Sequence, residues 1–105
     1  MNLLISDTSN YWNAGTNKNC PLGGIIATKK ECNSAVTWLG FTYRFESESD
    51  KYPAGCYIFL GSKKGYFNPI TDPSATTPTH NSSGICRAGM FHYIIHFLPI
   101  LFTIK

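Results

Sequence analysis

Charged residues are scarce in this sequence. Asp, Glu, Lys and Arg together make up 14% of the 105 residues, whereas about a quarter is usual in a soluble domain. The formal net charge is only +3, and no block of Lys and Arg is longer than two residues. Because nucleic-acid binding needs a dense array of cations against the phosphates, we expect no nucleic acid among the partners.

Catalytic and metal-binding motifs are also missing. The sequence has neither a phosphate-binding glycine loop nor a nucleophile elbow. The cysteines are too widely spaced for a zinc knuckle, and no histidine lies within five residues of any of them. His92 and His96 are four residues apart without a third ligand nearby, and His80 has no partner nucleophile. We therefore expect a protein that is not an enzyme and needs no cofactor or metal.

Only one long apolar run occurs, MFHYIIHFLPILFTI at residues 90–104. As a helix it would span roughly 22 Å, less than the roughly 30 Å of a bilayer core, and Pro99 would interrupt it. A transmembrane span is therefore not expected. Four alternatives stay open: contact with a membrane, a strand packed on the domain, a sequence foreign to the native fold, or a lipid-anchor signal. The other apolar run, residues 3–5, is too short for a signal-peptide core.

The composition divides the chain into three parts. Residues 1–19 form a polar N-terminal segment rich in Asn, Ser and Thr, residues 20–87 hold all four cysteines, and residues 88–105 form an apolar C-terminal tail. A domain of about 68 residues buries too little surface to be comfortably stable by itself. The cysteines are the candidates for covalent stabilisation.

One helix is predicted near the start of the domain. Thr28 and Glu31 have the spacing of a capping box, in which each side chain bonds the backbone N–H of the other residue. The apolar residues that follow recur at helical spacing and form one stripe: Cys32, Ala35, Val36 and Leu39. Gly40 supplies a residue that tolerates a left-handed conformation and ends the helix.

Strands are predicted after the helix. Aromatic and polar residues alternate from Phe41 to Glu46, which is typical of a strand buried on one face; residues 47–51 then form an exposed acidic loop. Residues 56–60 and 66–68 flank a glycine-bounded hairpin loop, and residues 69–83 form a long surface loop before Ile85 and Cys86 close the sheet. The predicted fold is α+β, with one capped helix packed on a short antiparallel sheet.

The four cysteines allow three pairings. We favour Cys32 with Cys56, because Cys32 lies on the helix stripe that faces the sheet. Cys20 with Cys86 would then join the two ends of the domain. Two disulfides in so small a domain indicate an oxidising compartment.

The order of parts, YPAGCY, then YFN, then ICR, resembles small extracellular cysteine-rich modules and is similar to apple/PAN-type modules. This resemblance implies a secreted or cell-surface location. The triplet that begins at Asn81 is an N-glycosylation acceptor in a predicted loop. Because no signal peptide is visible, we expect the chain to be a fragment, or one module, of a longer secreted or surface protein.

Aromatic residues give the candidate binding site. If Cys56 faces the helix, Tyr57 faces outward together with Tyr66. With Tyr52, and with Lys63 and Lys64 at the rim, they would form a platform for a sugar ring or a partner protein. The alternative is that these rings fill a second small core beneath residues 69–83.

We therefore expect a non-catalytic extracellular binding module of the adhesion or matrix type, which recognises protein or carbohydrate. The alternative is a structural subunit that self-assembles into a sheath, fibre or filament. The tail adds a further expectation, contact with a membrane.

Overall fold

The computed structural model describes residues 10–88. The predictions for residues 1–9 and 89–105, including the two tail histidines, lie outside the described residues. The elements in chain order are β1 (Tyr11–Asn13), η2 (Leu22–Gly24), α1 (Lys29–Trp38), β2 (Thr42–Glu46), β3 (Gly55–Phe59), β4 (Lys64–Asn68), η3 (Pro73–Ala75) and β5 (Ser82–Arg87).

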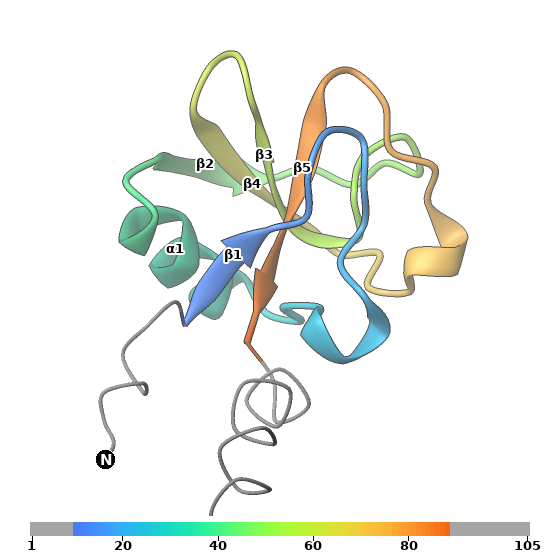
Figure 1. Cartoon of the computed structure of the whole chain (residues 1–105), viewed down its shortest axis with the longest axis horizontal. Helices are drawn as coiled ribbons and strands as arrows, with labels where there is room; N and C mark the ends of the chain where they lie inside the picture. Colours follow the sequence, from blue (N-terminus) through green and yellow to red (C-terminus); the bar gives the residue numbers. More distant parts are fainter. Residues whose placement is uncertain (1–9, 89–105) are drawn as a thin grey trace, which may run out of the picture.

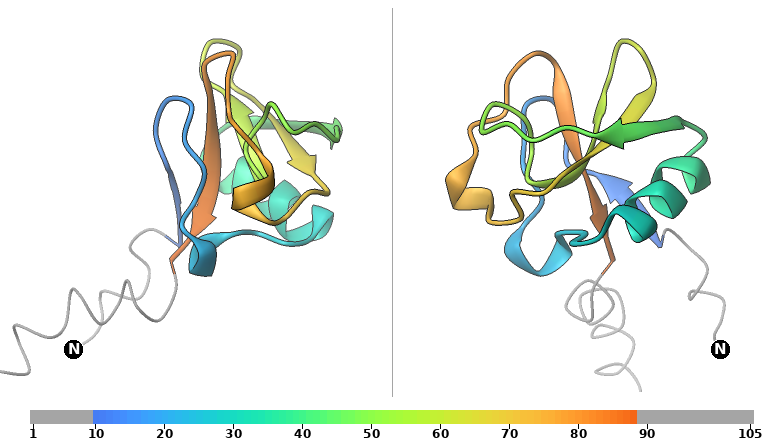
Figure 2. Two further views of the ribbon diagram at one scale, coloured as in Figure 1. Left: turned by 90° about the vertical axis from the view of Figure 1, so that its right-hand side faces the viewer. Right: turned by 180° about the vertical axis from the view of Figure 1, so that it is seen from behind.

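The strands form one five-stranded sheet in the order β1-β5-β3-β4-β2, and α1 packs on one face of it (Figures 1 and 2). The α+β prediction is confirmed. The sheet is larger than predicted and not wholly antiparallel, because β2 runs parallel to β4. The reason is the loop 47–54, which leads from the β2 edge to the far side of β4, where β3 pairs antiparallel with β4.

The helix begins and ends where the sequence predicts. Thr28 is its N-cap, and its Oγ1 accepts a hydrogen bond of 3.2 Å from the Glu31 backbone N–H. Gly40 follows the helix with φ +87°, a conformation that costs glycine little. The predicted stripe is the buried one, since Cys32, Ala35 and Val36 are fully buried.

Strand alternation separates two layers of side chains. On the helix side, Ile58 of β3, Phe67 of β4 and Ile85 of β5 join the α1 stripe in the main core. The intervening residues of the same strands, such as Tyr57 and Tyr66, occupy the opposite face. The two faces of the sheet therefore differ in chemistry: the core beneath the helix is mainly aliphatic with Phe67 as its aromatic member, and the opposite face is aromatic.

Each face carries one disulfide, and both predicted pairings are confirmed. Cys32–Cys56 joins α1 to β3 with a Cα–Cα distance of 5.2 Å. Cys20–Cys86 joins the segment after β1 to β5 with a Cα–Cα distance of 5.4 Å. Cys86 follows the core residue Ile85, so its side chain is on the face away from α1.

The sheet begins upstream of the predicted range 20–87. β1 pairs antiparallel with β5, Tyr11 lying opposite Arg87. Beyond this pair, the Ala88 backbone N–H donates to the Asn10 carbonyl over 3.0 Å. Both ends of the described unit therefore leave at the same place (Figure 1). No helix within residues 10–88 has the length and apolar character needed to cross a membrane.

Candidate functional site

Five rings gather on the sheet face opposite α1. This aromatic face consists of Phe45, Tyr52, Tyr57, Phe59 and Tyr66. Strand register brings most of them together, since Tyr66 of β4 lies opposite both Tyr57 of β3 and Phe45 of β2. Tyr52 reaches the group from loop 47–54. The predicted gathering of Tyr52, Tyr57 and Tyr66 on one side of the sheet is thus what the structure shows.

Tyr57 lies at the centre of this aromatic face and is fully buried, at 0% exposure. Its ring is stacked between Tyr52 and Tyr66, with centroid distances of 5.3 and 5.6 Å. The expectation that Tyr57 contacts a ligand from the surface is therefore wrong. It lies on the predicted face, but its neighbours cover it, so it is the floor beneath the exposed rings.

Burial also changes the chemistry of this side chain. The Tyr57 hydroxyl is buried, and no hydrogen bond of ordinary geometry reaches it from residues 10–88. Desolvation disfavours the tyrosinate form. It raises the pKa of Tyr57 to about 12, although the Ser47 hydroxyl acts in the opposite direction.

The solvent-facing part of the aromatic face is formed by the surrounding rings. Phe45 is 54% exposed and packs edge-on against Tyr66 at 5.1 Å, while Tyr52, Phe59 and Tyr66 are half-buried. The alternation predicted for residues 41–46 would bury Phe45 on the same face as Tyr43. That prediction is wrong for Phe45. The pairing of β2 with β4 is irregular between Tyr43 and Phe45, so these two side chains fall on different faces.

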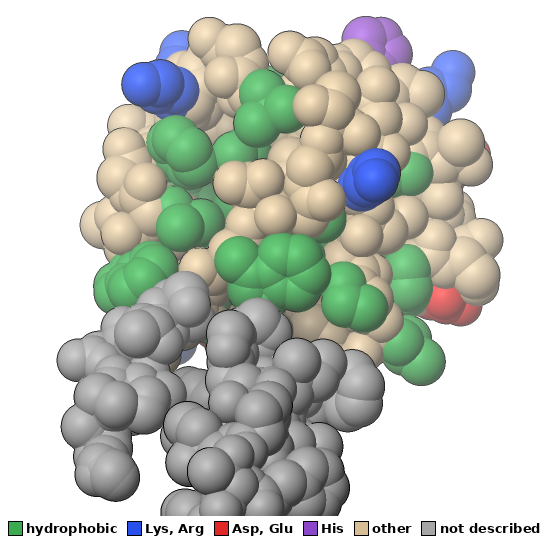
Figure 3. Space-filling model, in the orientation of Figure 1, with side chains coloured by type: hydrophobic (Ala, Val, Ile, Leu, Met, Phe, Trp, Pro, Cys, Tyr) green, Lys and Arg blue, Asp and Glu red, His purple; other side chains and the backbone are tan. Residues whose placement is uncertain are grey.

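The predicted basic rim is partly beside these rings. Lys64 lies directly opposite Phe59 and two residues before Tyr66, so it shares the aromatic face. Lys63 is exposed in the hairpin loop with φ +59°. On the view in Figure 3 the basic side chains are scattered and form no single continuous patch on this face, so positive charge alone does not define a site there.

A hollow of about 400 Å³, lined mostly by polar residues, adjoins the aromatic face. It is lined by Asp50, Lys51, Ala75, Thr77, Thr79 and His80. Its two walls are loop 47–54 and η3 with the segment that follows it, which lie side by side in Figures 1 and 2. Tyr52 links the hollow to the aromatic face, because the centroid of its ring lies 5.9 Å from that of the His80 ring.

The sequence does not reveal this hollow. The residue pattern predicts Asp50 in an exposed loop and His80 as an isolated residue. The walls meet through main-chain bonds: the Thr77 N–H donates to the Asp50 carbonyl over 2.7 Å and the Thr79 N–H to the Lys51 carbonyl over 2.8 Å. These residues are some 28 positions apart, and no local pattern reveals such a pairing.

Asn68, fully buried at the end of β4, fixes the first wall. Its Nδ2 donates to the carbonyls of Ser49, at 2.7 Å, and of Pro53, at 3.1 Å. Its Oδ1 accepts from the backbone N–H groups of Ser49 and Ile70. One side chain thus supplies the hydrogen bonds that a loop without regular structure needs when it is partly buried.

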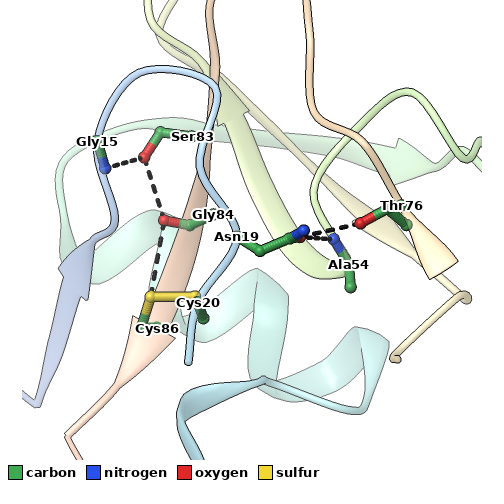
Figure 4. The surroundings of a disulfide bond; sticks show 8 residues. All are labelled: Gly15, Asn19, Cys20, Ala54, Thr76, Ser83, Gly84 and Cys86. Atoms are coloured by element: carbon green, nitrogen blue, oxygen red, sulfur yellow. Dashed lines mark hydrogen bonds between the residues drawn. A yellow bond between two sulfur atoms is a disulfide. The ribbon is translucent and has the colours of Figure 1, made fainter. Parts of the chain in front are cut away.

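Asn19 ties the first wall to the second (Figure 4). Its Oδ1 accepts from the Ala54 backbone N–H at 2.7 Å and from the Thr76 hydroxyl at 3.1 Å. Its Nδ2 donates to the Pro73 carbonyl at 3.2 Å. The next residue, Cys20, is covalently joined to β5. Both walls are therefore anchored to the sheet before any ligand binds.

The hollow and the aromatic face offer complementary groups to a ligand. The residues around the hollow carry a carboxylate, an ammonium group, hydroxyls and an imidazole, while the rings present apolar faces and edges. Within residues 10–88 no three His, Cys, Asp or Glu side chains are close enough together to hold a metal ion.

No protein-family model matches this chain, and no curated protein or solved structure matches it either. The resemblance to apple/PAN-type modules stays a prediction. What the site binds is therefore inferred from its own chemistry.

Proposed function

We propose that this protein is a non-catalytic, extracellular or cell-surface module that binds carbohydrate through the aromatic face and the adjoining hollow. The observation that carries the proposal is the contact between Tyr52 and His80, which joins the partly exposed rings to the adjoining hollow. The two disulfides support an oxidising environment.

The chemistry of the two surfaces suits a sugar. The apolar C–H face of a pyranose packs against aromatic rings, and Phe45 and Tyr66 offer such rings at the surface. Ring hydroxyl groups need both donors and acceptors, which Asp50, Thr77 and His80 supply in the hollow. A volume of about 400 Å³ is near the lower end for ligand sites, which favours one or two sugar rings.

A rigid site favours binding further. Loop ordering normally costs about 0.5 to 1.5 kcal/mol for each side chain that is immobilised. Here Asn68 and Asn19 already hold both walls in place through partly buried side-chain hydrogen bonds. Most of the entropy loss from ordering these loops therefore occurs when the chain folds, and little of it remains to oppose ligand binding.

The test compares two exposed rings. Phe45→Ala removes a ring from the aromatic face, and Trp38→Ala removes a ring of similar exposure, 48% against 54%, from α1. We expect a glycan that is selected on an array to lose about tenfold or more in affinity with Phe45→Ala, or about 1.4 kcal/mol, and to bind Trp38→Ala like the parent. Asp50→Asn should weaken binding as well.

Two results would count against the proposal. If Phe45→Ala and Trp38→Ala bind the selected glycan equally well, the aromatic face is not the site. If no glycan binds but a protein ligand does, and Phe45→Ala weakens it, the surface recognises protein and the carbohydrate assignment is wrong. Isothermal calorimetry on the variants separates these outcomes.

Self-assembly is the second candidate, favoured by the open edge of the sheet. β2 has β4 on one side and no neighbouring strand on the other within residues 10–88, and an edge strand with an exposed Phe45 is a template for pairing with another chain. Light scattering should then show a mass that rises with concentration and falls with Phe45→Lys. A constant monomer mass would exclude this candidate.

A further inference from the structure

Asn81 presents an accessible amide at the tip of a tight turn. His80 and Asn81 both have positive φ, 64° and 58°, and both are exposed. The Asn81 side chain makes no hydrogen bond to any residue in the range 10–88. It is also the first residue of the triplet Asn81-Ser82-Ser83, an acceptor motif for N-glycosylation.

The hydroxyl that this motif requires, that of Ser83, is inaccessible to solvent in the folded chain. Ser83 is fully buried, and its Oγ accepts from the Gly15 backbone N–H at 2.9 Å and donates to the Gly84 carbonyl at 3.2 Å (Figure 4). Gly15 belongs to the turn that follows β1. The folded chain therefore exposes the amide of the motif and hides its hydroxyl.

Two further contacts keep this turn in place. The backbone N–H of Asn17 donates to the Ser82 carbonyl, and the Ser82 backbone N–H donates to Asn17 Oδ1 over 3.2 Å. Three residues further along, the Cys20–Cys86 disulfide joins the same segment to β5. Ser83 becomes accessible only when the turn lifts from β5, and the disulfide opposes that movement.

We propose that Asn81 is an N-glycosylation site that accepts its glycan only before the turn after β1 docks on β5, so that glycosylation competes with closure of the Cys20–Cys86 disulfide. In the transfer, a bond forms between Asn81 Nδ2 and the anomeric carbon of a lipid-linked oligosaccharide. The bond from that carbon to the lipid diphosphate breaks, the diphosphate leaves with the bonding electrons, and the proton that the amide loses passes to water. This proposal rests on the proposed function only in assuming that the chain enters the secretory pathway.

The experiment uses the full chain in two states. The unmodified protein is incubated with an oligosaccharyltransferase and its lipid-linked donor, once oxidised and folded and once reduced and alkylated, and intact mass is measured. We expect the reduced chain to gain one glycan, the oxidised chain to gain none, and reduced Asn81→Gln to gain none.

Matched serine variants test the role of the buried hydroxyl. In the reduced chain, Ser83→Ala should abolish the transfer and Ser82→Ala, at the middle position of the motif, should preserve it. Equal modification of the oxidised and reduced chains would overturn the proposed order of events, and no modification of the reduced chain would overturn the site. Glycan binding by the unmodified protein is measured separately, so neither result bears on the proposed function.

Discussion

Asn68 and Ser49 hydrogen-bond to each other in both directions. Asn68 Nδ2 donates to the Ser49 carbonyl at 2.7 Å, and the Ser49 backbone N–H donates to Asn68 Oδ1 at 3.4 Å. The amide side chain thus reproduces the pairing of two strand residues. It holds a loop that has no strand to pair with, and that loop forms one wall of the hollow.

Asn68→Ala should be among the most damaging single substitutions. It would leave the Ser49 and Pro53 carbonyls without their donor and create a small cavity, so we expect the free energy of unfolding to fall by about 2 to 4 kcal/mol. Urea unfolding measures this. The control is Asn33→Ala, an exposed position on α1, which should change stability by about 0.5 kcal/mol or less. Similar losses in both variants would contradict the role given to Asn68.

Gly65→Ala should destabilise the packing of α1 on the sheet. A Cβ at residue 65 would collide with both methyl groups of Val36. Overpacking of this kind costs about 1 to 3 kcal/mol. Gly61→Ala is the matched control, because a Cβ there would meet nothing within 4 Å.

A double-mutant cycle tests whether Val36 is the cause of that loss. Val36→Ala removes the colliding methyl groups, so the double variant should be more stable than the sum of the two single losses implies. Purely additive losses would show that Gly65 is required for a reason other than room for Val36.

Tyr57 should make stability fall in alkaline solution. Its pKa is about 12 in the folded chain, against the ordinary value of 10.0, so between these values the unfolded chain ionises and the folded chain does not. The contribution of Tyr57 to the free energy of unfolding is complete below pH 10 and is lost as the pH rises toward 12. At pH 11 the loss is about 1.4 kcal/mol.

Tyr57→Phe isolates this effect. The variant keeps the stacked ring and removes only the buried hydroxyl, so its stability at neutral pH should be close to that of the parent. Urea unfolding at pH 9 and pH 11 should show a smaller alkaline loss for the variant, by about 1.4 kcal/mol. Equal losses would show that Tyr57 does not titrate abnormally.

Removal of either disulfide should lower stability by several kcal/mol. The loop-entropy model gives roughly 3.5 kcal/mol for Cys32–Cys56 and roughly 4.4 kcal/mol for Cys20–Cys86, because the second closes a longer loop. Paired Cys→Ser variants measured by urea unfolding check both values. Losses below about 1 kcal/mol would mean that the core, not the cross-links, maintains the fold.

Local signals made the helix predictable. The capping pair Thr28 and Glu31 sets where α1 begins, and the apolar stripe identifies its buried side, which in turn points Cys32 toward the sheet. The disulfide pairing followed from that orientation. β1 was not predictable, because three residues in a polar segment show no alternation; it exists through its pairing with β5.

The site was less predictable than the fold. Alternation placed Tyr57 on the correct face, but its burial depends on Tyr52 and Tyr66, which reach it from a loop and from another strand. The roles of Asn19 and Asn68 were not predicted, since an amide that holds a loop in place looks the same in sequence as one that faces solvent. The hollow depends on both of these amides and was therefore missed.

The neighbouring ends of the unit determine how it would respond to tension. A force applied through residues 10 and 88 would peel β1 from β5 one hydrogen-bonded pair at a time, since both strands are pulled from the same end. Once these strands separate, the force would act on the Cys20–Cys86 disulfide, which is a covalent bond and would bear the load. Between those two cysteines in sequence lie the helix, the three remaining strands and both walls of the hollow. The disulfide would therefore protect the proposed binding surface from the applied force.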